Sequence, residues 1–228
     1  PAGLAITTTY TWDALGRQLS VTEGAGTSSA HTVAYAYDDL GRRINETVDP
    51  GTGKLNLTTT YTYDDNGNLT SRKDAAGRIA RYTYDAANRQ IYAVDGAGGV
   101  RKTCYDADGR VVATRAYAKA IDTGSLAQVV STAAIDALVT RDDAHDVQAY
   151  AVYDGDGRQV LNLDGAGAVT ESVFDAAGHH YPIGEHTLPL TLPELADFKP
   201  EESDEPRPLL AKARFRETDE PLLDGCPC

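Results

Sequence analysis

Short stretches of the chain alternate between aromatic and small polar residues. In residues 61–63, Tyr61 and Tyr63 fall on one side of an extended chain and Thr62 on the other. A period of two in aromatic and β-branched residue types is typical of a β-strand. A tight turn follows from Asp64 to Gly67, because Asp side chains accept bonds from nearby backbone N–H groups and Gly tolerates positive φ. The pattern therefore predicts a strand that runs directly into a turn.

This strand-and-turn pattern occurs seven times, most often about 21 residues apart. In each copy an aromatic residue precedes Asp, and Gly or Asn follows three residues after the Asp. Asn is the residue that best replaces Gly at positive φ. The repeat aromatics are Trp12, Tyr37, Tyr63, Tyr84, Tyr105, Tyr153 and Phe174. The paired turn residues are Asp13 and Gly16, Asp38 and Gly41, Asp64 and Gly67, Asp85 and Asn88, Asp106 and Gly109, Asp154 and Gly157, and Asp175 and Gly178.

A repeat of this length indicates stacked copies of one supersecondary unit. In the third copy, Leu69 begins a second strand and residues 74–77 form a second turn, so each repeat holds two strands and two turns. One isolated hairpin is only marginally stable in water, and the copies must therefore stack. We predict an all-β fold: a β-hairpin ribbon or spiral of about seven repeats, whose aromatics align as a ladder on one face.

Arginine follows the turn glycine or asparagine in five copies. One interpretation is an anion-binding clamp. The other is that each arginine covers the strand exit and pairs with the Asp of a neighbouring repeat, and the regular presence of one Arg beside one Asp favours this structural role. These arginines are Arg17, Arg42, Arg89, Arg110 and Arg158.

The repeat pattern divides the chain into four segments. The first five copies fill residues 1–116, an insertion with a polar return loop fills 117–147, and the last two copies fill 148–178. In the insertion we expect one short amphipathic helix with Ser125 as its N-cap. Residues 179–228 hold eight of the ten prolines and are strongly acidic, which predicts an extended tail.

Charge and hydropathy exclude two classes of partner. The formal net charge is −13, which repels nucleic acid and anionic membrane surfaces. The sequence holds no apolar run long enough to insert into a membrane. The three cysteines, Cys104, Cys226 and Cys228, are an odd number, and they are candidates for a disulfide or a cross-link. A buried structural thiol is the favoured interpretation of Cys104.

Candidate chemistry is weak beside this regular pattern. Residues 106–109 and 154–157 resemble the start of calcium loops, but they lack the downstream Glu of an EF-hand, so turn formation explains them better. His179, His180 and His186 lack metal-site spacing. No nucleophile elbow or phosphate-binding glycine loop is present. We predict a non-enzymatic protein with no catalytic, metal or cofactor-binding residues, calcium being the one cofactor considered.

Two segments carry a family resemblance. Residues 61–71 and 105–112, with their Tyr-Asp…Gly order, resemble the YD repeats of the Rhs family, and the likeness extends from residue 10 to about residue 178. That family includes bacterial polymorphic toxins, insecticidal toxin-complex components and the teneurins. The resemblance implies a long β-hairpin ribbon that spirals into a shell, which in toxins encloses a cargo polypeptide, and it implies an extracellular or cell-surface location. YD repeats have also been linked to carbohydrate binding.

Three functions are consistent with the sequence. The first is a structural subunit that self-assembles through open sheet edges and its tail into a filament or sheath. The second is a fragment of a large secreted Rhs-type shell that encapsulates or presents a cargo polypeptide. The third is a module that binds glycans or cell surfaces through exposed Tyr side chains. The expected partners are therefore copies of the chain itself, the remainder of a larger shell, or glycans.

Overall fold

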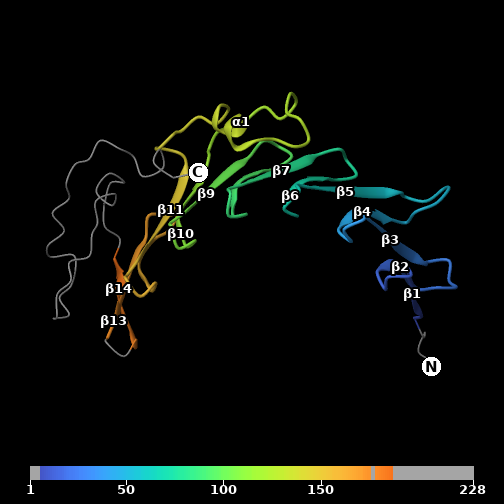
Figure 1. Ribbon diagram of the computed structural model, residues 1–228, viewed down its shortest axis with the longest axis horizontal. Coiled ribbons are helices and arrows are strands. Elements are labelled where there is room, and N and C mark those ends of the chain that lie inside the picture. The colour runs from blue at the N-terminus through green and yellow to red at the C-terminus, as the bar shows by residue number, and fades with distance from the viewer. Residues whose placement is uncertain (1–5, 176–177, 187–228) are drawn as a thin grey trace. The chain divides into compact units, whose positions relative to one another are not determined.

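The computed structural model describes residues 6–175 and 178–186. Within these residues the chain forms fourteen β-strands and one short helix, α1 (Thr132–Asp136), as Figure 1 shows. The prediction of an all-β hairpin ribbon is confirmed. The strands are β1 (Thr8–Trp12), β2 (Gln18–Glu23), β3 (His31–Tyr37), β4 (Arg43–Val48), β5 (Leu57–Tyr63), β6 (Leu69–Lys73), β7 (Ile79–Tyr84), β8 (Gln90–Val94), β9 (Val100–Tyr105), β10 (Val111–Ala116), β11 (Val147–Tyr153), β12 (Gln159–Leu163), β13 (Val169–Phe174) and β14 (His180–His186).

The chain divides into two compact units. Unit 1 comprises residues 6–84, 93–98 and 121–138, and unit 2 comprises residues 85–92, 99–120, 139–175 and 178–186 of the described chain. In unit 1, β1 to β7 pair antiparallel in chain order. In unit 2, β9 to β14 do the same. Every sheet contact inside a unit is therefore made between strands that are consecutive in sequence.

The last described strand, β14, lies after the end of the repeat motif. The repeat motif ends near Gly178, and we predicted an extended tail from residue 179. Instead, β14 pairs with β13 from Phe174 opposite His180 to Val169 opposite His186. Backbone pairing explains the difference, because a free strand edge accepts any extended segment, whether or not it carries the motif. Residues 187–228, which make up most of the predicted tail, lie outside the described residues.

The repeat turns share one hairpin geometry. In the turn that begins at Asp38, the Gly41 N–H donates to the Asp38 carbonyl at 3.0 Å, and the Asp38 N–H donates to the Arg42 carbonyl at 2.9 Å. Gly41 has a φ of 78°, and the strand register shifts between Ala36 and Tyr37. A type I turn followed by a left-handed residue and a bulge is a common hairpin connection. The Asp-x-x-Gly spacing in the sequence encodes this geometry.

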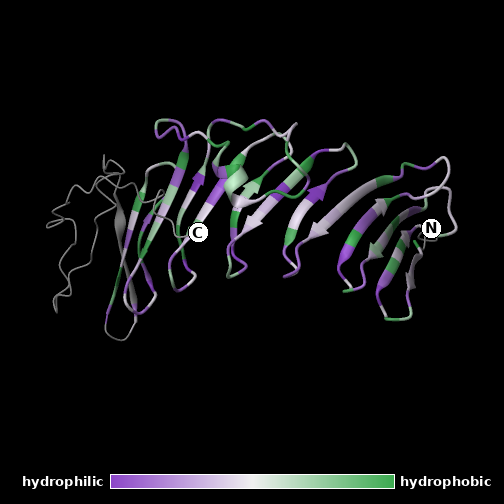
Figure 2. Cartoon of the chain, turned by 45° about the horizontal axis from the view of Figure 1, so that its top comes forward, coloured by the Kyte–Doolittle hydropathy of each residue, from purple (hydrophilic) through white to green (hydrophobic). Residues whose placement is uncertain are grey.

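The sheet of unit 1 has two chemically different faces. The register places four hydroxyl pairs on one face, including Thr47 opposite Thr58 and Thr62 opposite Ser71. Because side chains alternate along a strand, Tyr35 and Tyr61 lie on the other face. Arg43 contacts both rings, with its guanidinium carbon 5.2 Å and 5.7 Å from their centroids. Figure 2 shows the corresponding mixture of hydrophilic and hydrophobic residues along the strands.

Among the described residues, unit 2 holds more of the buried apolar side chains than unit 1 does. One cluster holds Cys104 and Ala113 with Val112 against them, and a second holds Leu163 and Val169 with Leu161 against them. Tyr150 of β11 packs against both clusters. The register explains this arrangement, because it places Ala113 opposite Cys104 and Tyr150 opposite both Ala113 and Leu163.

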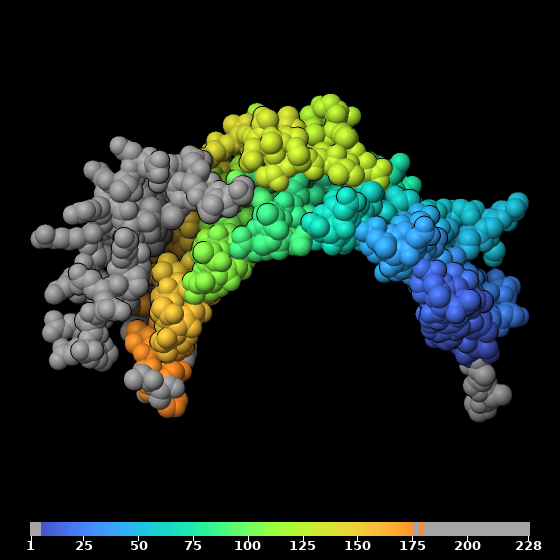
Figure 3. All heavy atoms as spheres, in the orientation of Figure 1, coloured from blue at the N-terminus to red at the C-terminus, as the bar shows by residue number. Residues whose placement is uncertain are grey.

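The insertion contains the predicted helix, but the helix begins later than expected. Helix α1 starts at Thr132, and its N-cap is Ser131, whose Oγ accepts a hydrogen bond from the Ala134 N–H. The predicted N-cap, Ser125, lies before it in irregular structure. The reason lies in segment 126–128, which is held against unit 1 by Arg81 and by the Thr62–Ser71 pair. In the space-filling view residues 121–138, which belong to unit 1, lie against the strands of that unit (Figure 3).

A turn-glycine substitution tests this hairpin geometry. Gly157 has a φ of 79°, whereas Gly155, in the same turn, lies outside the left-handed region and has open space around it. Gly157→Ala should lower the free energy of unfolding by about 1–2 kcal/mol, because an alanine is strained at positive φ. Gly155→Ala is the matched control and should change it by less than about 1 kcal/mol. Urea unfolding measures both, and equal effects of the two substitutions would contradict the assigned turn.

Candidate functional site: the turn lattice and the open edge

Each repeat turn that carries an arginine contains the same ion pair. In the second copy, Arg42 Nε donates to Asp38 Oδ2 at 2.7 Å, and the Arg42 backbone N–H donates to Asp38 Oδ1 at 2.8 Å. The Asp38 carboxylate therefore binds both the backbone N–H and the guanidinium of Arg42. It holds the guanidinium beside the start of the next strand. The corresponding Asp–Arg pairs join Nε to Oδ2 at 2.6–2.7 Å in Asp13–Arg17, Asp38–Arg42, Asp85–Arg89, Asp106–Arg110 and Asp154–Arg158.

The same arginine also binds the next repeat. The guanidinium carbon of Arg42 lies 4.9 Å from the ring centroid of Tyr63, and Arg42 Nη1 donates to the Asp64 carbonyl at 2.9 Å. A cation over an aromatic face is attracted by the ring quadrupole. The other pairs of arginine and ring are Arg17–Tyr37, Arg89–Tyr105, Arg110–Tyr153 and Arg158–Phe174, at 4.8–5.0 Å.

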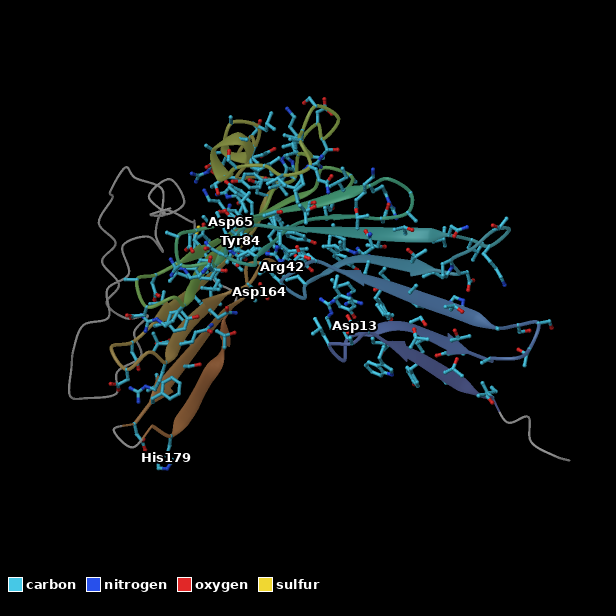
Figure 4. The ribbon with its side chains drawn as sticks, turned by 45° about the vertical axis from the view of Figure 1, so that its right-hand side comes forward. Asp13, Arg42, Asp65, Tyr84, Asp164 and His179 are labelled. Carbon is cyan, nitrogen blue, oxygen red and sulfur yellow. The ribbon has the colours of Figure 1, made fainter. Side chains whose placement is uncertain are left out.

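The tyrosine hydroxyls donate hydrogen bonds to backbone carbonyls of the preceding repeat. Tyr63 Oη donates to the Arg43 carbonyl at 2.9 Å, and Tyr105 Oη donates to the Gln90 carbonyl at 3.1 Å. A repeat that carries an arginine therefore contacts the ring of the next repeat, and where that ring is a tyrosine its hydroxyl donates to a carbonyl of the preceding repeat. We call this set of Asp–Arg, Arg–ring, Arg–carbonyl and hydroxyl–carbonyl contacts the turn lattice. In Figure 4, Asp13 and Arg42 mark the turn ends of the first two hairpins.

The lattice adds to one sequence-based expectation and corrects another. We expected the repeat aromatics to align as a ladder on one face; the aromatic ring pair that the structure shows, Tyr10–Trp12 at 6.3 Å, lies within a single strand. Rings of successive repeats lie two strands apart, which is about 10 Å and beyond stacking distance. Arginine occupies the space between them. The arginine carboxylate partner is also the Asp of its own turn, and the neighbouring Asp contributes its carbonyl instead.

Two copies depart from the arginine pattern. In the third copy Asn68 stands at the arginine position, and its Nδ2 donates to Asp64 Oδ2 at 2.9 Å. Its side chain is too short to reach the next ring, so Tyr84 keeps only the return bond from its hydroxyl to the Leu69 carbonyl, at 3.0 Å. In the seventh copy His179 Nδ1 lies 2.9 Å from Asp175 Oδ2.

The turn carboxylates are stabilised in their charged form. The Arg17 backbone N–H and the Arg17 guanidinium lower the pKa of Asp13 below its ordinary value of 3.8, against a smaller opposing effect of burial. For Asp38, burial raises the pKa, but the bonds from the Arg42 side chain and backbone outweigh it and the pKa is lowered. At neutral pH the turn lattice is therefore held together by ionised carboxylates.

The calcium-like turns bind arginine rather than presenting a cation site. Arg110 Nη2 contacts Asp108 Oδ2 at 3.0 Å, and Arg158 Nη2 contacts Asp156 Oδ2 at 2.9 Å. In the part of the chain that the structure describes, no group of three His, Cys, Asp or Glu side chains could hold a metal ion. The side chains of His180 and His186 lie outside the described residues. No helix in the same part of the chain is long and apolar enough to cross a membrane.

One buried arginine was not identified from the sequence. Arg115 has 1% of its side chain exposed, and its Nη1 binds Asp146 Oδ2 at 2.6 Å and Asp143 Oδ1 at 2.9 Å. Its Nη2 donates to Gln148 Oε1 at 2.6 Å. Burial raises the pKa of Asp146, but the Ala118 N–H and Arg115 lower it overall. This cluster fixes the return loop to β10. The acidic run from residue 142 to 146 was the signal that could have revealed a buried cation.

The cysteines are only partly described. Cys104 of β9 is buried, at 2% exposure, and it is disulfide-bonded, so the interpretation of Cys104 as a buried thiol is wrong. Cys226 and Cys228 lie outside the described residues, so a disulfide or cross-link that involves them stays a prediction.

Strand β1 forms an open edge of unit 1. All five of its residues are exposed, and it pairs with β2 alone among the described strands. Trp12 is 57% exposed, and no cation lies over its ring in the described part of the chain. In the other copies the ring at this position is covered by the preceding arginine, with Tyr84 the exception explained by Asn68. An uncharged, extended edge of this kind is a template for pairing with another strand.

Comparisons with known proteins point to one repeat family. The family model described as RHS Repeat matches residues 55–79 and 63–101. A search of curated proteins finds no match. Among solved structures, a TcdB2-TccC3-Cdc42 crystal structure matches with 12% identity over 77% of this chain and 14% of that chain, at a TM-score of 0.23. A Photorhabdus luminescens Tc holotoxin pore, carrying the mutation TccC3-D651A, matches with 12% identity over 79% of this chain and 14% of that chain, at a TM-score of 0.23. At these TM-scores the structural matches carry no argument.

Removing one lattice arginine tests how strongly repeats are coupled. Arg42→Ala should lower the free energy of unfolding by about 2 kcal/mol or more, because it removes a charged hydrogen bond and a cation–π contact. Arg78→Ala is the matched control in unit 1. Arg78 binds Asp74 in a second turn, with 72% of its side chain exposed, and such surface pairs contribute at most about 1 kcal/mol. Urea unfolding compares them.

In the third copy, where Asn68 stands at the arginine position, an arginine can be added instead of removed. Asn68→Arg should place a guanidinium over Tyr84. Its free energy of unfolding should exceed that of Asn68→Ala, which removes the side chain without adding a cation, by about 0.5–1 kcal/mol. The interpretation fails if Arg78→Ala costs as much as Arg42→Ala, or if Asn68→Arg is no more stable than Asn68→Ala.

The turn carboxylates also predict acid sensitivity. Because the pKa of Asp13 is lowered in the folded chain, its contribution is complete above the unfolded pKa of about 4 and is lost as pH falls through the lower folded pKa. The free energy of unfolding should stay level down to about pH 5 and then decline below about pH 4. Asp13→Asn should make that decline shallower. Chemical unfolding at a series of pH values tests this, and stability that rises on acidification would contradict it.

Proposed function

Because residues 55–79 and 63–101 match the RHS Repeat family model, we propose that this chain is a structural segment of a larger Rhs-type shell. Its open β1 edge receives a further repeat. The observation that carries the proposal is Trp12, a repeat aromatic in an exposed edge strand that lacks the arginine contact made to the corresponding rings of five later copies. The chain acts by pairing and enclosing rather than by catalysis.

The turn lattice specifies what an incoming repeat has to supply. Arg17 donates to the Asp38 carbonyl at 3.2 Å, while that carbonyl also accepts the Gly41 N–H. The Asp13 carbonyl accepts only the equivalent Gly16 N–H among the bonds of the described chain. An added hairpin that ends in an Asp-x-x-Gly-Arg turn can therefore pair with β1, place its guanidinium over Trp12 and donate to Asp13.

The family match favours a shell segment over the filament that the sequence alone placed first. In a shell, the β1 edge is completed by another repeat of the ribbon. In a filament, a second copy of the chain completes it, and an interface that does not close would give open polymers. Enclosure or presentation of a cargo polypeptide and an extracellular location belong to this proposal.

Trp12 is the single tryptophan of the sequence, so its fluorescence reports on β1 alone. We would extend the full chain at its N-terminus with a hairpin copied from residues 31–49, whose turn contains Arg42. Docking of this hairpin should shift Trp12 emission to shorter wavelength and reduce quenching by acrylamide. A matched extension in which Gln replaces that arginine should protect Trp12 less and should unfold at lower urea concentration.

Measurements on the unextended chain distinguish the shell segment from the filament. If its Trp12 stays exposed at every protein concentration and sedimentation gives one monomeric species, the shell segment is supported. If Trp12 becomes protected as concentration rises and open-ended polymers sediment, the filament replaces the shell segment. Equal exposure of Trp12 in the extended and unextended chains would overturn docking at β1 altogether.

A further inference from the structure

Hydroxyl side chains pair across strands on one face of unit 1. Four pairs lie within hydrogen-bonding distance, at 2.7–3.0 Å between oxygens. The pairs are Thr11–Ser20, Thr22–Thr32, Thr47–Thr58 and Thr62–Ser71.

The strand register places all four pairs on the same side of the sheet. Ser20 lies opposite Ala34, Ala34 opposite Thr47, and Thr47 opposite Thr58. Thr62 lies two positions from Thr60 on β5, and side chains two apart share a face. Ser71 in turn lies opposite Arg81 on β7. We call this side of β1–β7 the hydroxyl face.

The insertion already occupies one end of the hydroxyl face. Gln128 Nε2 donates to Thr62 Oγ1 at 2.8 Å and lies 3.2 Å from Ser71 Oγ. Beside it, the buried Arg81 donates to the Leu126 and Ala127 carbonyls at 3.0 Å and 2.7 Å. A hydroxyl pair is thus used to hold a segment of irregular backbone by a side-chain amide.

The other three pairs present the same chemistry without a covering segment in the described chain. Thr11 is exposed, and the remaining members are partly exposed. Between the pairs the face carries small residues, Ala34 and Ala36, which leave room for a chain to lie flat. The members of this face on β1–β5 are uncharged; the neighbouring charged groups are Lys73 of β6, opposite Thr60, and Asp49, whose Oδ1 accepts the Thr32 N–H. The uncharged members are Thr9, Thr11, Ser20, Thr22, Thr32, Ala34, Ala36, Asn45, Thr47, Thr58, Thr60 and Thr62.

We propose that the hydroxyl face of β1–β5 is a docking surface for an extended polypeptide segment of another chain that presents Gln or Asn side chains. Each amide donates to a Thr–Thr or Thr–Ser pair, as Gln128 does at Thr62 and Ser71. The inference does not depend on strand addition at β1, because the sheet face and the sheet edge use different atoms. It adds a recognition surface to the proposed structural segment.

The position of the aromatic rings favours a polypeptide over a glycan. Sugar rings are commonly bound on the faces of aromatic side chains, and here Tyr35 and Tyr61 lie on the opposite side of the sheet, in contact with Arg43. The hydroxyl face offers hydrogen bonds alone. A glycan that bound this unit would therefore be expected to contact the tyrosines and not the threonine pairs.

The test uses the full chain and a synthetic peptide with the sequence of residues 124–131, which includes Gln128. In the full chain the Thr62–Ser71 pair is already bound by Gln128 of the insertion. Binding of the peptide therefore reports on the other three hydroxyl pairs. NMR of threonine methyl groups should show saturable shifts at Thr22, Thr32, Thr47 and Thr58, and none at Thr59 on the opposite face. The Gln128→Leu peptide should bind about tenfold more weakly, because it loses the amide hydrogen bonds.

Two variants of the chain and one control variant test the hydroxyl face itself. Replacing Thr22, Thr32, Thr47 and Thr58 with Val preserves side-chain shape and should weaken calorimetric binding of the Gln peptide about tenfold, while Thr59→Val should leave it unchanged. Ala34→Lys keeps every hydroxyl and should block the peptide sterically. The proposal is overturned if the Gln and Leu peptides bind equally, if Ala34→Lys binds normally, or if a chitohexaose probe shifts these threonines while the peptide does not.

Discussion

One arginine side chain with three partners holds successive repeats together. Arg42 binds the carboxylate of Asp38 in its own turn, then lies over Tyr63 and donates to the Asp64 carbonyl in the next. Guanidinium groups suit this role because they are planar and carry several donors in a fixed arrangement, so an ion pair, a ring contact and a carbonyl bond can be made together. Lysine offers a point charge and cannot reproduce all three.

This constraint explains why the repeat has its sequence form. The Asp has to follow the aromatic so that its carbonyl lies beside the ring that the preceding arginine covers. The glycine has to occupy the third position after the Asp so that the turn closes and the arginine leaves it beside its carboxylate. The Asp–Arg pair lies within one turn, and the ring, carbonyl and hydroxyl contacts join it to a copy that is adjacent in sequence. Trp12, the first repeat ring, is exposed and has no arginine over it in the described part of the chain.

The sequence predicted the parts of the structure that depend on local chemistry. Alternation around Tyr61 and Tyr63 located a strand, Asp64 and Gly67 located a turn, and the recurrence of both predicted the hairpin ribbon. The Arg–Tyr contacts could not be predicted, because they depend on the spacing between hairpins, and two strands separate the rings by more than stacking allows. The start of α1 was missed because tertiary contacts of Gln128 and Arg81 override the local helical pattern. Arg115 was missed because its acidic partners, Asp143 and Asp146, lie 28 and 31 residues further along.

The central claim is that the arginine and the next aromatic act as one coupled pair. A double-mutant cycle in unit 1 measures this directly, with Arg42→Ala, Tyr63→Leu and the two combined, each unfolded in urea. The coupling energy is the part of the combined effect that the two single effects do not account for. We expect a favourable coupling of about 1 kcal/mol or more, as for a partly buried cation–π pair. Strictly additive single effects would show that the repeats are joined by backbone pairing alone and would contradict the account.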